Sequence, residues 1–306
     1  MSFKLTILGS SGALPAYGRL PSSHYLQINN THILIDCGEG TQLQLRKFQL
    51  PFQRLSHIFI SHLHGDHYLG LMGLLFTLHL QRRTNDLHIY SQPGLDQIIL
   101  LQLKYSNSSL NYKLVFHPIT SDAPATICED KTMTVETIPL LHKISCTGFL
   151  FKEKTKPKRI DKDKLPKGML LEYIAKLKAG DDVIAENGDL LYKSEDYTLP
   201  PRPSLSYAYC SDTAYKEEIS NQIKGVDLLY HEATFTQEHQ DKAIETRHST
   251  ALEAARIASK ANAKKLLIGH FSARYKTLEV LLEEAKAHFT NTHLAIEGET
   301  IDLRKP

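Results

Sequence analysis

Several things are scarce or missing in this sequence: tryptophan is absent, there are only four cysteines, and no apolar run is long. None of the cysteines forms a Cys-x-x-Cys pair, so we expect reduced thiols and no disulfide framework. They are Cys37, Cys128, Cys146 and Cys210. Residues 1–5 lack the apolar core of a signal peptide, and no apolar run approaches the length of a membrane span. We therefore expect a cytoplasmic protein without a membrane segment.

A large excess of charge is also missing. The 36 lysines and arginines nearly balance the 34 acidic residues, which leaves a net charge of +2 over 306 residues. No global field therefore drives the chain onto nucleic acid or membrane, and any basic patch must be local. The length suffices for one large domain or two ordinary ones. Histidine, by contrast, is abundant with 16 residues, and this abundance points to metal binding.

The most informative stretch is Ser61-His62-Leu63-His64-Gly65-Asp66-His67. The short apolar run 58–60 before it predicts a buried strand, and the longer run 69–76 after it predicts a helix. A lone histidine near a strand end is usually a core or surface residue. Four imidazole and carboxylate groups within six residues are instead typical of zinc and similar divalent ions. The stretch therefore predicts half of a two-metal site.

The spacing divides these four side chains into two pairs. Residues two apart in an extended segment point the same way, so His62 and His64 reach one point. The chain can bend at Gly65, after which Asp66 and His67 face a second point. The pattern favours two neighbouring ion positions.

Acidic or imidazole side chains also follow four later strands that the sequence predicts. They are His142 after residues 133–138, Asp212 after 206–210, Glu232 after 226–230 and His270 after 266–268. Strands that alternate with helices form layered α/β folds, in which ligand sites gather at strand ends. One such residue means little, but the repetition at the same relative place predicts a shared site.

Local signals predict two helix starts and allow two different roles for Asp36. Thr41 is expected to cap a helix, and Ser249 or Thr250 to cap another, with Glu253 at the spacing of a capping box. Asp36 follows a strand end, where it is either a brace for a metal-bound histidine or a turn residue.

Other local signals concern turns and strands. Residues 9–12, Gly-Ser-Ser-Gly, form either a turn that lets a phosphate approach backbone N–H groups or a plain tight turn. Residues 25–28 and 33–35 predict a hairpin across Asn29-Asn30, and the last residues predict a strand pair.

A change of composition marks residues 153–203 as an insertion that projects from the core. Its first part is rich in lysine, and a Pro-Pro-Arg-Pro segment closes it. A solvated charge run is the ordinary interpretation. The alternative is an arm that binds nucleic acid, because lysines on phosphates supply affinity without reading sequence.

The motifs together resemble the ribonuclease Z family of the metallo-β-lactamase superfamily. The superfamily is indicated by the His-x-His-x-Asp-His motif followed by His142, Asp212 and His270. The narrower marks are the segments 36–42, His-Glu-Ala-Thr-Phe at 231–235, His-Ser-Thr at 248–250 and Ser-Ala-Arg-Tyr at 272–275. The likeness covers nearly the whole chain.

The resemblance implies an αββα sandwich over residues 1–306, with residues 153–203 inserted as a flexible arm that grips tRNA. It also implies a homodimer and two zinc ions, which manganese or iron can replace. In that scheme His62, His64 and His142 hold one ion, Asp66, His67 and His270 hold the other, and Asp212 bridges them. The family's bacterial arm often carries a Gly-Pro pair, but this chain reads Pro166-Lys167-Gly168-Met169, so we expect a differently shaped arm.

The implied activity is removal of the 3′ trailer from precursor tRNA. The resemblance makes Asp66 the acceptor of the water proton, and His248 is our candidate general acid, because imidazole titrates near working pH. Glu232 would hold the other nitrogen of His248. A plain surface histidine at a helix start is the alternative for His248.

Candidate substrate contacts are fewer and less defined. Arg274 is either a phosphate clamp or part of a structural salt bridge. In the arm, Lys156, Lys158 and Arg159 are candidates for contact with the tRNA body. Rival functions are a small-molecule phosphodiesterase or another hydrolase on the same fold, and a non-catalytic RNA-binding protein.

Overall fold

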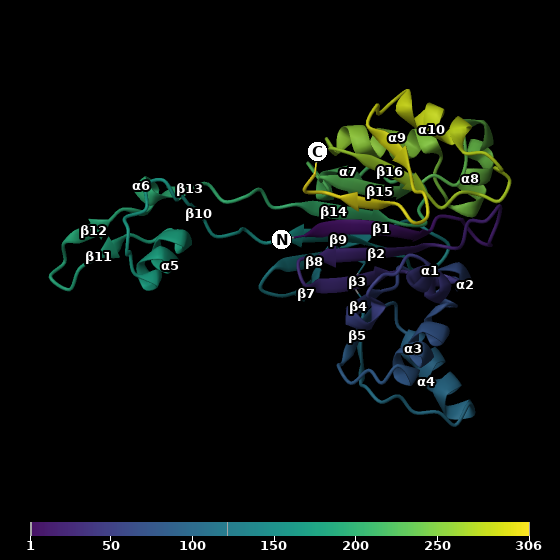
Figure 1. Cartoon of the computed structure of the whole chain (residues 1–306). Helices are drawn as coiled ribbons and strands as arrows, with labels where there is room; N and C mark the ends of the chain where they lie inside the picture. The colour runs from purple at the N-terminus through teal and green to yellow at the C-terminus, as the bar shows by residue number, and fades with distance from the viewer. Residues whose placement is uncertain (1, 121, 306) are drawn as a thin grey trace. The chain divides into compact units, whose positions relative to one another are not determined.

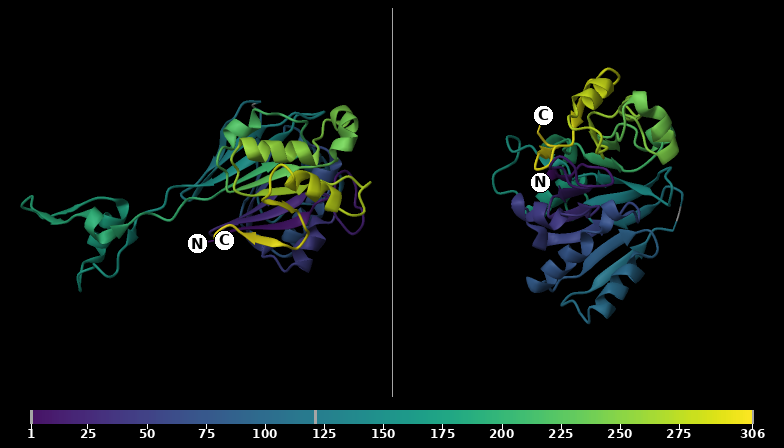
Figure 2. Two further views of the ribbon diagram at one scale, coloured as in Figure 1. Left: turned by 90° about the horizontal axis from the view of Figure 1, so that it is seen from above. Right: turned by 90° about the vertical axis from the view of Figure 1, so that its right-hand side faces the viewer.

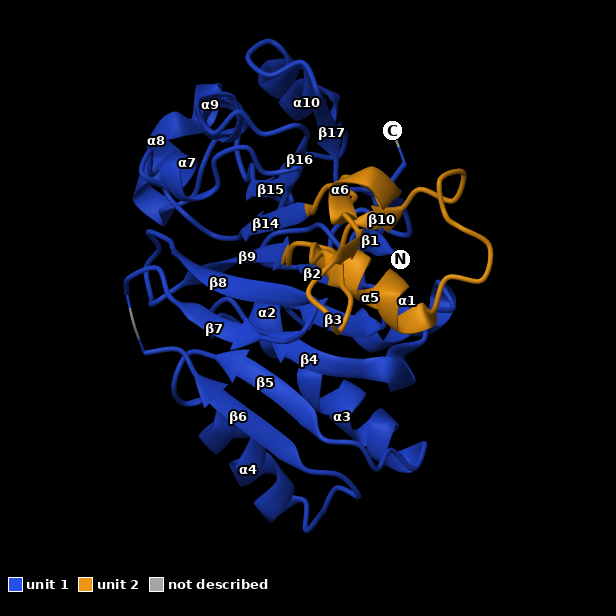
Figure 3. Cartoon of the chain, turned by 90° about the vertical axis from the view of Figure 1, so that its left-hand side faces the viewer, with its two compact units in different colours: residues 1–152, 206–306 blue, residues 153–205 orange. Residues whose placement is uncertain are grey.

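The structure is a computed structural model that describes residues 2–120 and 122–305. The chain forms two compact units, residues 1–152 with 206–306 and residues 153–205 (Figure 3). The first unit contains two seven-stranded sheets, and the second contains two small two-stranded sheets. No helix in the described ranges has the length and apolar character needed to span a membrane.

The first sheet of the larger unit has the strand order β18-β1-β2-β3-β4-β5-β6. Its strands are β1 (Phe3–Gly9), β2 (Ser23–Ile28), β3 (Thr31–Ile35), β4 (Leu55–Phe59), β5 (Leu87–Ser91), β6 (Leu114–Pro118) and β18 (Thr300–Asp302). Strands β3 to β6 run parallel, whereas β2 and β3 form the antiparallel hairpin that the sequence predicts across residues 29–30.

The second sheet has the order β17-β16-β15-β14-β9-β8-β7. Its strands are β7 (Thr126–Glu129), β8 (Met133–Pro139), β9 (Thr147–Glu153), β14 (Ser206–Cys210), β15 (Leu228–Glu232), β16 (Leu266–Gly269) and β17 (Thr292–Leu294). Strands β14 to β17 run parallel. The predicted terminal strands exist but do not pair with each other, because β17 joins β16 in this sheet and β18 joins β1 in the first.

Helices cover the outer faces of both sheets, as Figures 1 and 2 show. On the first sheet they are α1 (Thr41–Lys47), α2 (Gly65–Tyr68), α3 (Leu71–Leu80) and α4 (Leu95–Tyr105), with the 3₁₀ turn η1 (Phe52–Arg54). On the second they are α7 (Ile219–Gln222), α8 (Gln240–Thr246), α9 (Ala251–Lys260) and α10 (Glu279–Lys286), with η2 (Gln237–His239). Each helical layer packs on its sheet through its own apolar cluster. The predicted αββα sandwich is confirmed.

Aromatic rings fill the space between the sheets, where large residues are needed and tryptophan is absent. The Phe59 ring of β4 lies 5.3 Å from Phe149 and 5.4 Å from Phe151 of β9, measured between ring centroids. The imidazole of His24 on β2 packs edge-on against Tyr230 of β15 at 4.4 Å. All of these side chains are buried. Each large aromatic removes about 150–250 Å² of surface from water, so this layer contributes strongly to holding the sheets together.

Local predictions have mixed outcomes. Thr250 caps α9 in a complete capping box with Glu253, as predicted. Thr41 does not cap α1: it is the first helical residue, Gly40 precedes it with a φ of 82°, and the Thr41 hydroxyl donates to the carbonyl of Gly38. The prediction was wrong because a residue with positive φ was needed at the cap, which glycine supplies without strain. Strands β7 and β9 were not predicted.

The smaller unit contains one nine-residue helix and short strands. Its elements are β10 (Arg159–Ile160), α5 (Leu171–Ala179), β11 (Val183–Ile184), β12 (Leu190–Tyr192), α6 (Ser194–Tyr197) and β13 (Thr198–Leu199). Strand β10 pairs with β13 and β11 pairs with β12. Few side chains are fully buried here, among them Leu177 and Val183. This unit has a small core of its own.

Candidate metal centre and active site

Loops at the carboxyl ends of parallel strands bring the predicted site residues together. The His-x-His-x-Asp-His loop follows β4, Asp212 follows β14, Glu232 ends β15 and His270 follows β16. His142 lies in the connection between β8 and β9. These segments come from both sheets, so the sandwich itself assembles the site.

One group of donor atoms is formed by His62, His64, His142 and Asp212, whose ligand atoms all lie within 4.8 Å of one another. The His64 Nδ1 atom lies 3.0 Å from His62 Nε2 and 3.2 Å from His142 Nε2. The Asp212 Oδ2 atom lies 3.7 Å from the Nε2 atoms of both His62 and His142. These four side chains enclose one point.

A second group is formed by Asp66, His67, His270 and again Asp212. The Asp212 Oδ1 atom lies 3.3 Å from His67 Nε2 and 3.2 Å from His270 Nε2. The Asp66 Oδ2 atom lies 3.3 Å and 3.5 Å from the same two nitrogens. The two oxygens of Asp212 therefore face different groups, which is the arrangement of a bridging carboxylate.

The far sides of the rings are fixed by hydrogen bonds that leave the near nitrogens available. His67 Nδ1 lies 2.7 Å from Asp36 Oδ2, His270 Nδ1 lies 2.9 Å from Thr234 Oγ1, and His142 Nδ1 lies 2.9 Å from the Arg247 carbonyl. Donation from Nδ1 leaves a lone pair on Nε2, which is the form that binds a metal. Among the described residues, the buried Nε2 atoms of His67 and His270 have no hydrogen-bond partner.

These features fit a pair of divalent ions. Three imidazole nitrogens at 3.0–3.2 Å cannot all donate to one another. Bonds of about 2.0–2.1 Å from a tetrahedral zinc ion to imidazole would place two nitrogens about 3.3 Å apart. The donor set of imidazole nitrogen and carboxylate oxygen is also that of zinc. The side chains present therefore suit the ions that the superfamily resemblance implies.

The charges in the site favour ionised carboxylates. Burial opposes ionisation of Asp212, but His270, His67 and His62 outweigh it and hold the pKa of this carboxyl well below its usual range. Asp66 behaves in the same way, because His67 and His270 lower its pKa against the effect of burial. Both aspartates are thus negatively charged near neutral pH, as metal ligands must be.

His248 and Glu232 form an ion pair beside the two groups. The His248 Nδ1 atom lies 2.8 Å from Glu232 Oε1 and 4.0 Å from Asp212 Oδ2. Burial lowers the pKa of His248, but the charge of Glu232 and its hydrogen bond outweigh this and raise it to about 9. The Glu232 carboxylate also accepts from the Thr213 backbone N–H and the Thr234 hydroxyl. His248 is therefore protonated at neutral pH, and its side chain is still 15% exposed.

Asp36 braces the site rather than serving only as a turn residue. Besides His67 it accepts from the backbone N–H of Ser61 at 2.7 Å and from the buried hydroxyl of Tyr209 at 2.6 Å. Its φ of 54° shows that it also occupies a turn conformation. Both interpretations of Asp36 apply.

The Gly-Ser-Ser-Gly turn at residues 9–12 is a plain turn whose N–H groups are used within the protein. The N–H groups of Ser10 and Ser11 donate to the Leu20 carbonyl, and that of Gly12 to the Phe271 carbonyl. A side chain at Gly12 would meet the His270 ring at 2.9 Å, so glycine allows close approach to this ring. The next N–H, that of Ala13, donates to Asp66 Oδ2. The turn supports the site instead of offering free donors to a phosphate.

Arg274 lies close to this site, and the proposed arm residues lie in the smaller unit. The exposed Arg274 guanidinium sits 5.6 Å from the ring of Phe235, which in turn contacts His248, and no ion pair of Arg274 occurs in the described part of the chain. The salt-bridge alternative for Arg274 is thus not observed.

Each candidate of the arm has a partner inside the arm. Lys156 Nζ binds Glu153 at 2.6 Å, Lys158 Nζ donates to the Ser194 hydroxyl, and Arg159 donates to the Pro200 carbonyl. Their contact with substrate stays a prediction.

Several contributors were not identified from the sequence. Thr234 binds both Glu232 and His270, and it lies inside the His-Glu-Ala-Thr motif, which was a usable signal. The backbone carbonyl of Arg247 and the hydroxyl of Tyr209 carry no sequence signal, because a carbonyl is present in every residue and buried tyrosines are common.

Comparison with known proteins agrees with this geometry. The chain is 46% identical to a ribonuclease Z of Bacteroides fragilis over 302 residues, which cover 98% of this chain and 99% of that protein. It is 48% identical to a ribonuclease Z of Cytophaga hutchinsonii, with 97% and 95% covered. The chain belongs to the ribonuclease Z family. A family model described as anti-Pycsar protein Apyc1 also matches residues 3–165 of this ribonuclease Z family member.

Solved structures extend the likeness to three dimensions. The crystal structure of human tRNase Z, short form, aligns with a TM-score of 0.71 at 27% identity and covers 98% of this chain and 99% of its own. The metallo-β-lactamase fold protein YhfI of Bacillus subtilis aligns with a TM-score of 0.69 at 20% identity, over 99% of this chain and 100% of its own, and so shares the fold. The family and fold that the sequence resembles are confirmed.

Proposed function

We propose that this chain is a metal-dependent endoribonuclease that removes the 3′ trailer from precursor tRNA, leaving a 3′-hydroxyl on the tRNA and a 5′-phosphate on the trailer. The observation that carries the proposal is the pair of donor groups joined by Asp212, with the His248–Glu232 ion pair beside them, in a member of the ribonuclease Z family. Two charge-stabilising positions and a proton donor are what phosphodiester hydrolysis requires.

Two zinc ions are the proposed cofactors, and manganese or iron can substitute. His62, His64 and His142 would hold one ion, Asp66, His67 and His270 the other, and Asp212 both. When bound, the ions supply hydroxide near neutral pH and neutralise charge on the phosphate oxygens.

Asp66 would orient the attacking water and accept its proton. Its Oδ2 atom already accepts from the backbone N–H of Ala13 at 2.9 Å, which fixes the carboxylate. The side chain is 11% exposed, whereas Asp212 is 3% exposed, so Asp66 is the more accessible of the two to water and substrate.

His248 would protonate the leaving 3′ oxygen. Glu232 engages Nδ1, so Nε2 is the nitrogen left to face the substrate. The raised pKa keeps the proton on the ring at neutral pH until the leaving oxygen gains charge. The capping box of Thr250 and Glu253 fixes the start of α9 two residues later and so holds His248 in position.

Substrate contacts are proposed for Arg274 and for the smaller unit. Arg274 is exposed and without an acidic partner among the described residues, which supports a phosphate contact. In the arm, Lys156, Lys158 and Arg159 are retained as candidate contacts for the tRNA body, together with the exposed lysines 162, 164 and 167.

We also propose a cytoplasmic homodimer. Exposed apolar side chains directly after α2 and on α4 support self-association, since a surface of this kind is seldom left open to water. They include Leu69 (62% exposed), Leu101 (55%) and Tyr105 (79%). Light scattering on the purified protein measures the mass directly, and a monomer at micromolar concentration would refute the dimer.

The test of the function uses end-labelled precursor tRNA with and without a chelator. We expect a single endonucleolytic cut after the tRNA body, a trailer with a 5′-phosphate, and loss of cleavage with chelator that added zinc restores. Cleavage that persists in chelator, or intact precursor with zinc-loaded protein, would overturn the proposal.

The same preparation discriminates the alternative hydrolase. A small-molecule phosphodiesterase would turn over a chromogenic diester with a kcat/KM at least equal to that for precursor tRNA. We expect the reverse order, because the diester lacks the tRNA body that the arm would bind.

A further inference from the structure

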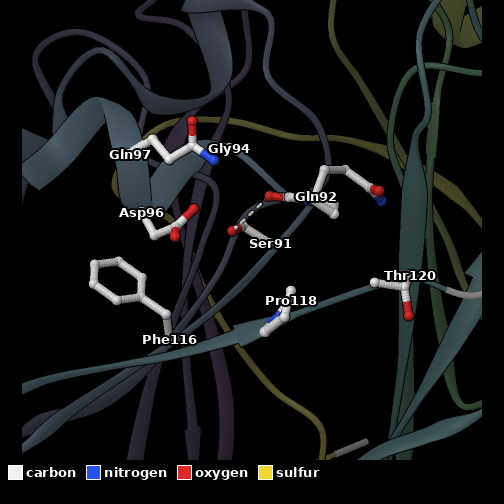
Figure 4. Close-up of a pocket in the computed structure, with 9 residues that line it drawn as sticks. Ser91, Gln92, Gly94, Asp96, Gln97, Phe116, Pro118 and Thr120 are labelled. Carbon is white, nitrogen blue, oxygen red and sulfur yellow. Dashed lines mark hydrogen bonds between the residues drawn. The ribbon is translucent and has the colours of Figure 1, made fainter.

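A cavity of about 300 Å³ opens next to the His-x-His-x-Asp-His loop, and none of the catalytic roles proposed above involves this cavity. It is lined by Ser91, Gln92 and Gly94, by Asp96 and Gln97 of α4, and by residues of the segment 116–120. Figure 4 shows Asp96 and Gln97 on one side and Phe116 and Pro118 on the other. The volume accommodates one flat ring system rather than an extended molecule.

The position of the cavity is fixed by the strand order. Strands β4, β5 and β6 are parallel neighbours, so their carboxyl ends lie at one edge of the sheet. The His-x-His-x-Asp-His loop follows β4, and the cavity lies at the ends of β5 and β6. The spacing of neighbouring strands places the cavity about 5–10 Å from the end of β4. A side chain at Gly94 would lie 3.8 Å from Leu63, which stands between His62 and His64.

Hydrogen bonds connect one wall of the cavity to the loop at residues 61–67. The buried amide of Gln92 donates to the Thr147 hydroxyl at 2.7 Å and accepts from the Ser145 hydroxyl at 3.0 Å. The Thr147 N–H in turn donates to the carbonyl of Ser61, directly before the first ligand. The cavity and the loop at residues 61–67 thus share one hydrogen-bonded frame, so an occupant of the cavity would be held near the proposed metal ligands.

The remaining lining combines an aromatic ring with an acceptor. Phe116 is half-buried and offers a ring for stacking, and Pro118 continues this apolar side. Opposite them, the half-buried Asp96 carboxylate has no hydrogen bond or ion pair within the described ranges. A negative charge repels phosphate but accepts from N–H groups, and an aromatic ring binds the face of a base.

We propose that this cavity binds one unstacked nucleobase of the RNA, close to the scissile phosphate, and prefers guanine. Guanine presents two adjacent N–H donors, at N1 and N2, which match the two oxygens of one carboxylate, while adenine and cytosine present a single amino group on that edge. The inference rests on the proposed function for its substrate, but a base can be bound whether or not the protein cuts precursor tRNA.

Binding is tested first without catalysis. The sequence has no tryptophan, so Phe116→Trp provides a single indole reporter in the cavity. We expect short single-stranded RNAs that contain guanine to quench its fluorescence in the presence of chelator, and the same RNAs with adenine or cytosine instead of guanine to need at least about tenfold more RNA. Equal quenching by all sequences would overturn the guanine preference, and no quenching by any would overturn the site.

The second test asks whether the cavity acts during cleavage. In precursor tRNAs that carry one abasic nucleotide at successive positions around the cut, we expect one position at which kcat/KM falls about 5- to 150-fold. In Phe116→Ala, the same position should lose its effect, because the stacking partner is already gone. Equal sensitivity of wild type and Phe116→Ala at every position would overturn the proposal.

Asp96→Asn should reduce the preference for guanine at that position while the stacking remains. The matched control is Asp241→Asn, since Asp241 is likewise an acidic residue in the first turn of a helix but lies outside the cavity. The two proposals fail separately: cleavage without guanine-dependent quenching refutes the cavity, whereas quenching without cleavage of precursor tRNA refutes the proposed activity.

Discussion

At the scale of single residues, the site depends on backbone conformations that most side chains avoid. Asp36, Arg247 and His270 have φ values of 54°, 58° and 57°. Such conformations cost of order 1–3 kcal/mol each and persist only where the surroundings hold them. Each of the three residues takes part in fixing a histidine ring, so the strain coincides with the positioning of the proposed ligands.

Replacing His248 separates proton donation from metal binding. We expect His248→Ala to keep both metals and to lose about 10²–10⁴-fold in kcat, the usual contribution of a positioned acid. Metal content by atomic emission and kcat on precursor tRNA measure the two effects, with the exposed His293→Ala as the control. Empty metal sites in His248→Ala would contradict this separation.

The ion pair of His248 predicts the alkaline limb of the pH profile. The acid must be protonated, so kcat falls as pH rises through its pKa, which Glu232 raises to about 9. In Glu232→Gln the raising charge is gone, and the fall should move to lower pH, towards the ordinary value of 6.5. A profile of kcat against pH for both proteins checks the shift. An unchanged alkaline limb would mean that another group limits the rate.

The brace behind His67 gives a graded prediction. Asp36→Ala should lower metal affinity about 10- to 100-fold, the usual effect of losing the partner of a ligand histidine. Tyr209→Phe removes only one of the hydrogen bonds to Asp36 and should have a smaller effect in the same direction. Competition with a chromogenic chelator measures both. Equal metal affinity of the wild type, Asp36→Ala and Tyr209→Phe would show that the hydrogen bonds of Asp36 do not affect metal binding.

At the scale of elements, the arm can be removed at a natural junction. Lys152 of β9 and Ser206 of β14 are directly paired neighbours on antiparallel strands, so a two-residue Asn-Gly turn can join them. The shortened protein should hydrolyse a small diester as well as wild type but lose most of its affinity for precursor tRNA, with a weaker salt dependence. Filter binding at several salt concentrations measures this. A parallel loss of both activities would make the arm structural.

The elements also show what the sequence could predict. Strands such as β2, β3 and β14 combine apolar runs with clear turn signals, and they were predicted within a few residues. Strands β7 and β9 were missed because β7 has mostly exposed or half-buried positions and β9 stands at the edge of the lysine-rich insertion. The meeting of His142 with His64 depends on packing between segments 78 residues apart, which only strand-end reasoning and the family resemblance suggested.

At the scale of the whole molecule, the two sheets contribute donors to both of the proposed metal-binding groups. Metal should therefore stabilise the fold, by about 4 kcal/mol when free zinc is a thousandfold above its Kd. We expect chelator to lower the Tm by several degrees in wild type and in the arm-less protein, and to have little effect on His62→Ala. Differential scanning fluorimetry makes the comparison. A wild-type Tm that is the same with and without chelator would contradict the expectation.

The first turn of the chain touches its last proposed ligand. Gly12 lies against the His270 ring, and the backbone of Ser10 pairs with Phe271. A ribosome extends a chain by roughly 5–20 residues per second, so the histidines at 62–67 leave the exit tunnel many seconds before position 270 is even joined. The nascent protein thus exposes a partial chelating loop for many seconds, and ion capture can be completed only after position 270 has been synthesised.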